Sequence, residues 1–168
     1  MEEKSMPLGE LCAALEGHRL PAWQELPDLE LYMDQVLALV ERYLGDYPGY
    51  DSKGLTASMV NNYVKLGALP APQKKKYKRG HLARLIMICV LKSVLPIAAV
   101  QRLIDEGLRE STEEDFYGCF CTLFERAGKA AALGARELPE DAARTAVLGA
   151  ALRAQAEQAL AKQFLVQK

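Results

Sequence analysis

The sequence predicts a mainly α-helical protein in which sheet is limited to one short segment. Apolar residues recur three or four positions apart along most of the 168 residues, which is the spacing of one helix face. Alternation with a period of two, which is typical of strands, is scarce. From Ala127 to Lys168, 14 of 42 residues are alanine, the strongest helix former. A chain of this length buries enough apolar surface to fold without a metal or a disulfide.

The first third of the chain predicts two helices separated by an irregular segment. Apolar positions between residues 8 and 15 have helical spacing, and Pro7 stands just ahead of them. Residues 17–27 interrupt this pattern. A second apolar stripe over residues 29–44 predicts a longer helix, which Asp28 would cap. The glycines and proline that follow it predict a loop over residues 45–54.

The next predicted helix has two distinct faces. Thr56 is a suitable N-cap, and Gly67 is suited to the position just past the C-terminal end. Val60, Tyr63 and Val64 would line the inner face. The opposite face would carry Ser58, Asn61, Asn62 and Lys65. Adjacent asparagines are poor helix formers, so helix propensity does not explain them, whereas a surface that uses amides would.

The centre of the chain predicts a basic turn followed by a buried helix. Two prolines prevent a helix over residues 69–72, and residues 73–78 suit an exposed loop or hairpin. Residues 79–95 predict a helix that is apolar on nearly all sides, as a central buried helix is. Pro96 would be the first residue of another helix.

The last third predicts two further helices. Residues 111–114 (STEE) form a capping box, and Phe116, Phe120 and Phe124 follow at a spacing of four, as core or dimer contacts. We expect the glycines at 128 and 134 to loosen the chain. Residues 139–168 predict a final helix that could pair with a second copy in a homodimer.

Charge is distributed in blocks, although the net charge is only −1. Residues 52–104 carry ten basic and no acidic side chains, whereas the segments on either side are acidic. A basic block favours a polyanionic partner. A solvated basic surface that balances the acidic segments is the alternative interpretation.

Other features limit the possible functions. The N-terminal residues do not resemble a signal peptide, and we expect a cytoplasmic protein with no membrane segment and reduced cysteines. Cys119 and Cys121 are too close for a usual metal-ligand pair, and no second pair accompanies them. We interpret His81 as a capping or flanking residue and Trp23 as a packing residue. No phosphate-binding loop, nucleophile elbow or HExxH string is present, so we expect no enzymatic activity, catalytic residue, metal or cofactor.

Residues 56–70 (TASMVNNYVKLGALP) resemble the second helix of MerR-type winged-helix regulators. Lys76-Tyr77-Lys78 falls where that family leaves its wing, and residues 81–92 and 97–104 fall on the two helices that follow. The resemblance implies a winged helix-turn-helix core with a small β wing and additional C-terminal helices. Asn61 stands where those regulators usually have arginine.

The strings LYMDQV (31–36), LTASMVNNYVK (55–65) and KKY (75–77) are similar to those of an uncharacterised bacterial family, domain of unknown function 1836. This resemblance extends over about residues 28–125. We therefore expect an N-terminal extension at 1–27, the winged-helix domain at 28–110, and a C-terminal helical region at 111–168 that could dimerise.

The adjacent polar helix and basic turn predict a sequence-specific reader of double-stranded DNA, and thus a transcriptional regulator. Asparagine can pair with adenine, and lysines can hold phosphates. The alternative hypothesis is a protein–protein adaptor built on the same fold, without DNA binding. The candidate DNA-binding residues are Thr56, Ser58, Asn61, Asn62, Lys65, Lys74, Lys75, Lys76, Tyr77, Lys78 and Arg79.

Overall fold

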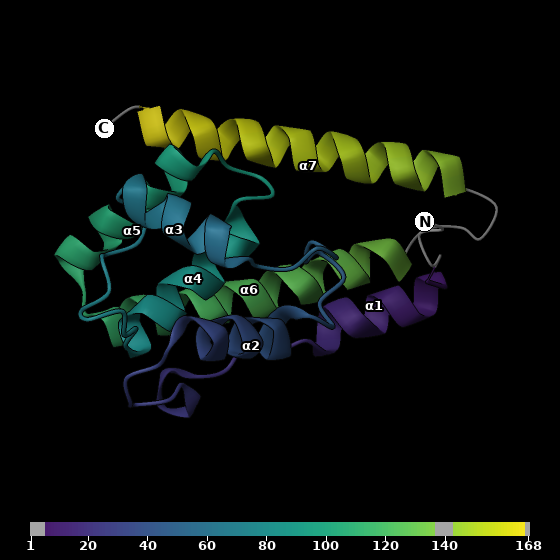
Figure 1. Ribbon diagram of the computed structural model, residues 1–168. Coiled ribbons are helices and arrows are strands. Elements are labelled where there is room, and N and C mark those ends of the chain that lie inside the picture. The colour runs from purple at the N-terminus through teal and green to yellow at the C-terminus, as the bar shows by residue number, and fades with distance from the viewer. Residues whose placement is uncertain (1–5, 137–142, 167–168) are drawn as a thin grey trace.

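The computed structural model describes residues 6–136 and 143–166, and this part of the chain is mainly helical (Figure 1). None of its helices combines the length and the apolar character needed to cross a membrane. The elements are α1 (Leu8–Gly17), the 3₁₀ helix η1 (Trp23–Glu25), α2 (Met33–Leu44), α3 (Ala57–Lys65), α4 (Arg79–Leu91), α5 (Ile97–Glu110), α6 (Glu113–Arg136) and α7 (Ala143–Val166).

Helix α4 forms the centre of the core, as its apolar sequence predicts. Every side chain from Leu82 to Cys89 is buried, because α2, α5 and α6 all pack against this helix. Figure 1 shows α4 between α3 and α2. The helix ends at Leu91 rather than at residue 95, and Pro96 lies at the N-cap of α5 instead of at its first helical position.

Helix α6 is continuous through both glycines, so the expected loosening at Gly128 and Gly134 is wrong. Its C-terminal half lies along α1, and the two helices form the most extensive helix–helix contact in the described part of the chain (Figure 1). A Cβ atom at Gly128 would lie 2.3 Å from the carbonyl oxygen of Leu15. Gly128 therefore permits close packing of the two helices, which explains a glycine inside a helix.

Two predicted helix starts are shifted. Asp28 does not cap α2, which begins at Met33, because Leu31 is held in extended backbone by Tyr77. The Gln35 side chain instead accepts a hydrogen bond from the backbone N–H of Tyr32 at 2.9 Å. At α6 the cap is one residue later than predicted: the Thr112 hydroxyl accepts from the backbone N–H of Asp115. Phe116, Phe120 and Phe124 are partly buried against the core.

The small β wing is not seen as strands in the described residues. Two isolated antiparallel bridges stand in its place, Gln73 with Lys76 and Leu31 with Tyr77. The predicted final helix begins at Ala143, and residues 139–142 and 167–168 of that prediction lie outside the described ranges.

A buried arginine fixes the connection that follows α3. Arg84 of α4 is 7% exposed, and its Nε donates to the carbonyl of Ala68. Its Nη2 donates to the carboxylate of Asp105 on α5, whose side chain is 40% exposed. A guanidinium can be buried in this way because its donors and its charge both have partners. One side chain thus joins α4, α5 and the end of α3.

We expect Arg84→Met to lower the free energy of unfolding by about 3 kcal/mol, since it leaves a buried carbonyl and a half-buried carboxylate without a partner. Urea unfolding measures the change. Arg102→Met is the control, because Arg102 pairs with Glu106 at a more exposed site and should cost less than about 1 kcal/mol. Equal losses in both variants would show that the Arg84 network has no special role.

Candidate nucleic-acid interface

The ends of α3 are set by the two residues that the sequence predicts. The Thr56 hydroxyl accepts a hydrogen bond from the backbone N–H of Met59 at 3.2 Å, as an N-cap does. Gly67, just past the C-terminal end, has a φ of +74°, a conformation that glycine adopts without strain. The backbone N–H of Leu69 then donates to the carbonyl of Tyr63 at 3.1 Å, so the connection folds back onto the helix.

The two faces of α3 differ as the sequence predicts. Val60 and Tyr63 are buried, and Val64 is half-buried. Four polar side chains are exposed on the opposite side, and we call them the amide face: Ser58, Asn61, Asn62 and Lys65. A shallow hollow of about 420 Å³ lies over three of them, with Met59 and Tyr63 completing its lining. The amides are therefore free to bind a partner.

Residues 73–78 form a tight basic turn, which we call the lysine hairpin. The backbone N–H of Lys76 donates to the carbonyl of Gln73 at 2.9 Å. Lys74 and Lys75 at its tip both have positive φ, +49° and +63°. Positive φ at both central residues is characteristic of the type I′ turn, which normally carries Asn-Gly.

Lysine is an unfavourable residue at both tip positions. The left-handed conformation costs a residue with a Cβ roughly 1 kcal/mol or more relative to glycine. Both lysine side chains are exposed, so packing does not compensate for this strain. Backbone strain of this kind is found more often at functional sites than elsewhere.

The hairpin is anchored to the core by Tyr77 and His81. Tyr77 is 3% exposed and exchanges two backbone hydrogen bonds of 2.8 Å with Leu31, so its side chain lies beneath the surface rather than on it. His81 Nδ1 accepts from the backbone N–H of Lys78 at 3.0 Å and so caps α4, as predicted. Burial lowers the pKa of the His81 imidazole, which keeps this nitrogen an acceptor at neutral pH.

The basic residues fall into two groups. Lys65, Lys74, Lys75 and Lys78 are exposed, and within the described ranges no carboxylate lies within 4 Å of their ammonium groups. Lys76 and Arg79 are already paired. Lys76 Nζ lies 3.0 Å from Glu30, and Arg79 lies 3.6 Å from Asp28 with its guanidinium over the Trp23 ring.

Sequence reasoning missed these two pairings. Glu30 and Lys76 are 46 positions apart, and only the bridge between Leu31 and Tyr77 brings them together. The string LYMDQV (31–36) indicated the family resemblance, but it did not predict that this segment contacts the hairpin. In the described part of the chain, the amide face and the lysine hairpin therefore carry four free cations, where the sequence predicted six.

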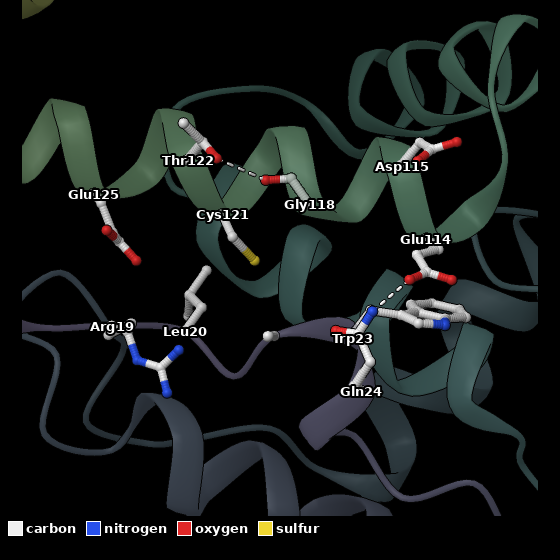
Figure 2. A pocket seen from close by; sticks show the side chains of 11 residues that line it. Arg19, Leu20, Trp23, Gln24, Glu114, Asp115, Gly118, Cys121, Thr122 and Glu125 are labelled. Carbon is white, nitrogen blue, oxygen red and sulfur yellow. Dashed lines mark hydrogen bonds between the residues drawn. The ribbon is translucent and has the colours of Figure 1, made fainter.

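A second hollow lies between residues 19–24 and α6, with a volume of about 520 Å³ (Figure 2). Glu125 lines one end opposite Arg19, and Glu114 accepts a hydrogen bond from Gln24 at the other (Figure 2). Burial raises the pKa of the Cys121 thiol on its floor, so the thiol stays protonated and weakly nucleophilic. In the part of the chain that is described, no cluster of three histidine, cysteine or acidic residues could hold a metal ion.

Comparison with known proteins gives one match. A family model described as a domain of unknown function, DUF1836, matches residues 21–122. These residues include the amide face and the lysine hairpin, whereas α1 and α7 lie outside the match. Searches of the curated proteins and of the solved structures found no match.

Replacing the tip lysines by the residues that the turn prefers tests whether they are strained. We expect Lys74→Asn plus Lys75→Gly to raise the free energy of unfolding by about 1 kcal/mol, since both residues suit positive φ. Thermal unfolding measures the change. Lys53→Asn, at an exposed turn residue whose φ is not positive, is the control and should have little effect. A lower stability for the double variant would contradict the strain.

Proposed function

The chain belongs to the family described as domain of unknown function DUF1836, and we propose that it is a sequence-specific double-stranded DNA-binding protein that regulates transcription. One observation carries the proposal. The amide face and the tip of the lysine hairpin, which are joined by the short connection that Arg84 fixes, are both exposed. Strained lysines at that tip are better explained by a polyanionic partner than by folding.

In this proposal α3 enters the major groove. Its outward side chains are short or flexible, so the helix backbone can approach the base edges. Asn61 and Asn62 each carry a donor and an acceptor, which can pair bidentately with N6 and N7 of adenine. The Thr56 hydroxyl caps the helix. Thr56 therefore adds to the proposed DNA-binding surface only by its exposed position at the first turn of α3.

The lysines would supply affinity that does not depend on sequence. Lys65, Lys74, Lys75 and Lys78 are the free cations that can meet phosphates. Each phosphate neutralised contributes about 0.9 to the slope of log affinity against log salt. Tyr77 would support the hairpin from below rather than contact the nucleic acid, because it is buried.

We propose a MerR-type winged helix-turn-helix architecture for residues 28–110, as the resemblance of residues 56–70 implies. Helices α2 and α3 would be the helix-turn-helix pair, and the lysine hairpin would take the place of the wing. Support comes from α3 with its two caps, from the buried α4 that follows, and from the contact of α2 with α3.

Fluorescence anisotropy with duplex DNA at several salt concentrations tests the DNA-binding function. We expect a log–log salt slope of about −3 to −4, since four lysines are free. Lys74→Glu plus Lys75→Glu should weaken binding by about a hundredfold at 0.1 M salt, because two contacts are lost and two repulsions are added.

Arg126→Glu plus Lys129→Glu is the matched control, since it makes the same change in net charge at exposed positions of α6. Asn61→Ala plus Asn62→Ala should reduce the preference among duplex sequences and leave the salt slope unchanged. Equal affinity for the wild type and the hairpin variant would overturn the proposal.

We also propose that two copies pair through α7. Four large apolar side chains of this helix are 59–70% exposed: Val147, Leu148, Leu152 and Leu160. Its C-terminal half contacts the rest of the described chain through Gln158 and Leu165. A two-fold dimer would present two amide faces to a paired DNA site. The same apolar residues would serve the alternative function, a protein–protein adaptor that binds a different chain.

We expect Leu148→Glu plus Leu152→Glu to abolish the dimer, because charge on an apolar interface is not compensated. Mass measurement by light scattering at several concentrations checks this. The control is Ala150→Glu plus Ala161→Glu, whose positions lie about 160–220° around the helix from the two leucines. A wild type that is monomeric and does not bind DNA would favour the adaptor over the regulator.

A further inference from the structure

Two carboxylates already occupy the positions that phosphates would take beside the lysine hairpin. Lys76 Nζ donates to Glu30 Oε2 at 3.0 Å, and the Arg79 guanidinium lies 3.6 Å from Asp28. The ion pair between Lys76 and Glu30 is partly exposed, with side chains 36% and 47% accessible. A phosphate approaching from solvent would therefore meet an occupied cation.

The backbone holds the Glu30 segment beside the hairpin. Leu31, the residue after Glu30, exchanges two hydrogen bonds of 2.8 Å with Tyr77. The Lys76 ammonium also lies 5.9 Å from the centre of the exposed Tyr32 ring, which is within cation–π range. The acidic segment thus needs little further ordering to remain paired, so a competing anion must displace a fixed partner.

We propose that Asp28 and Glu30 compete with nucleic acid from within the same chain. They pair with Lys76 and Arg79 and so reduce the affinity of the site for weakly binding polyanions. The inference rests on the proposed function and adds regulation of the same site. A single phosphate gains too little at one cation to displace Glu30. A duplex contacts several cations at once, so it displaces Glu30 only when the amide face and the free lysines also bind.

The exposed ion pair between Lys76 and Glu30 contributes little to folding stability. Its competition with nucleic acid can therefore be measured apart from any structural role. Exposed pairs contribute little to stability, and a bridge of two backbone hydrogen bonds already fixes the segment. Removal of the Glu30 charge should therefore change binding while the melting temperature stays within a few degrees of the wild type.

The test compares Glu30→Gln with Glu16→Gln. Both variants remove one carboxylate from a partly exposed ion pair, and Glu16 pairs with Arg136 at 2.7 Å, away from the hairpin. Two readouts are measured on the full chain: the salt concentration that elutes each protein from immobilised heparin, and the salt dependence of binding to a random-sequence duplex. The salt concentration of elution from heparin measures how strongly the carboxylates compete with a polyanion of any kind.

Glu30→Gln should elute from heparin at higher salt than the control. It should bind duplex about five- to tenfold more tightly at 0.1 M salt, with a slope steeper by about 0.9, because one more cation is free. Identical elution of the two variants would overturn the competition. Later elution of Glu30→Gln without duplex binding by any of the proteins would support the competition and refute the DNA-binding function.

Discussion

The architecture depends on one buried guanidinium. Arg84 lies in the buried stretch of α4, and it binds the carbonyl of Ala68 and the carboxylate of Asp105. These contacts fix the connection between α3 and the lysine hairpin against α5. A charge in this position is tolerated because a carboxylate pairs with it and a carbonyl accepts from it. The positions of the amide face and of the hairpin therefore both follow from the packing around α4.

The surface built on this core combines features that oppose maximal stability. Asparagines lie within a nine-residue helix that they do not favour, and two lysines adopt left-handed backbone at the tip of a turn. The acidic segment at residues 28–30 pairs with Lys76 of the hairpin and with the neighbouring Arg79. Local propensity and turn chemistry disagree with the fold at this surface, and such conflicts are expected at functional sites.

Features set by local physics could be predicted from the sequence. The caps of α3, its two faces and the buried α4 follow from residue types within a few positions of one another. Features set by distant contacts could not. The start of α2 depends on Tyr77, the continuity of α6 through Gly128 depends on α1, and the pairing of Lys76 depends on Glu30. Arg84 likewise gave no signal of burial, because its partners lie 16 and 21 positions away.

We propose that the amide face and the lysine hairpin form one nucleic-acid-binding surface. Backbone amide shifts of the ¹⁵N-labelled protein, followed during titration with duplex DNA, distinguish one surface from two. A single surface requires shifts that concentrate at residues 56–66 and 73–79 and saturate together at one DNA concentration. Shifts confined to α7 or to the hollow of Figure 2, or separate saturation of the two regions, would contradict it.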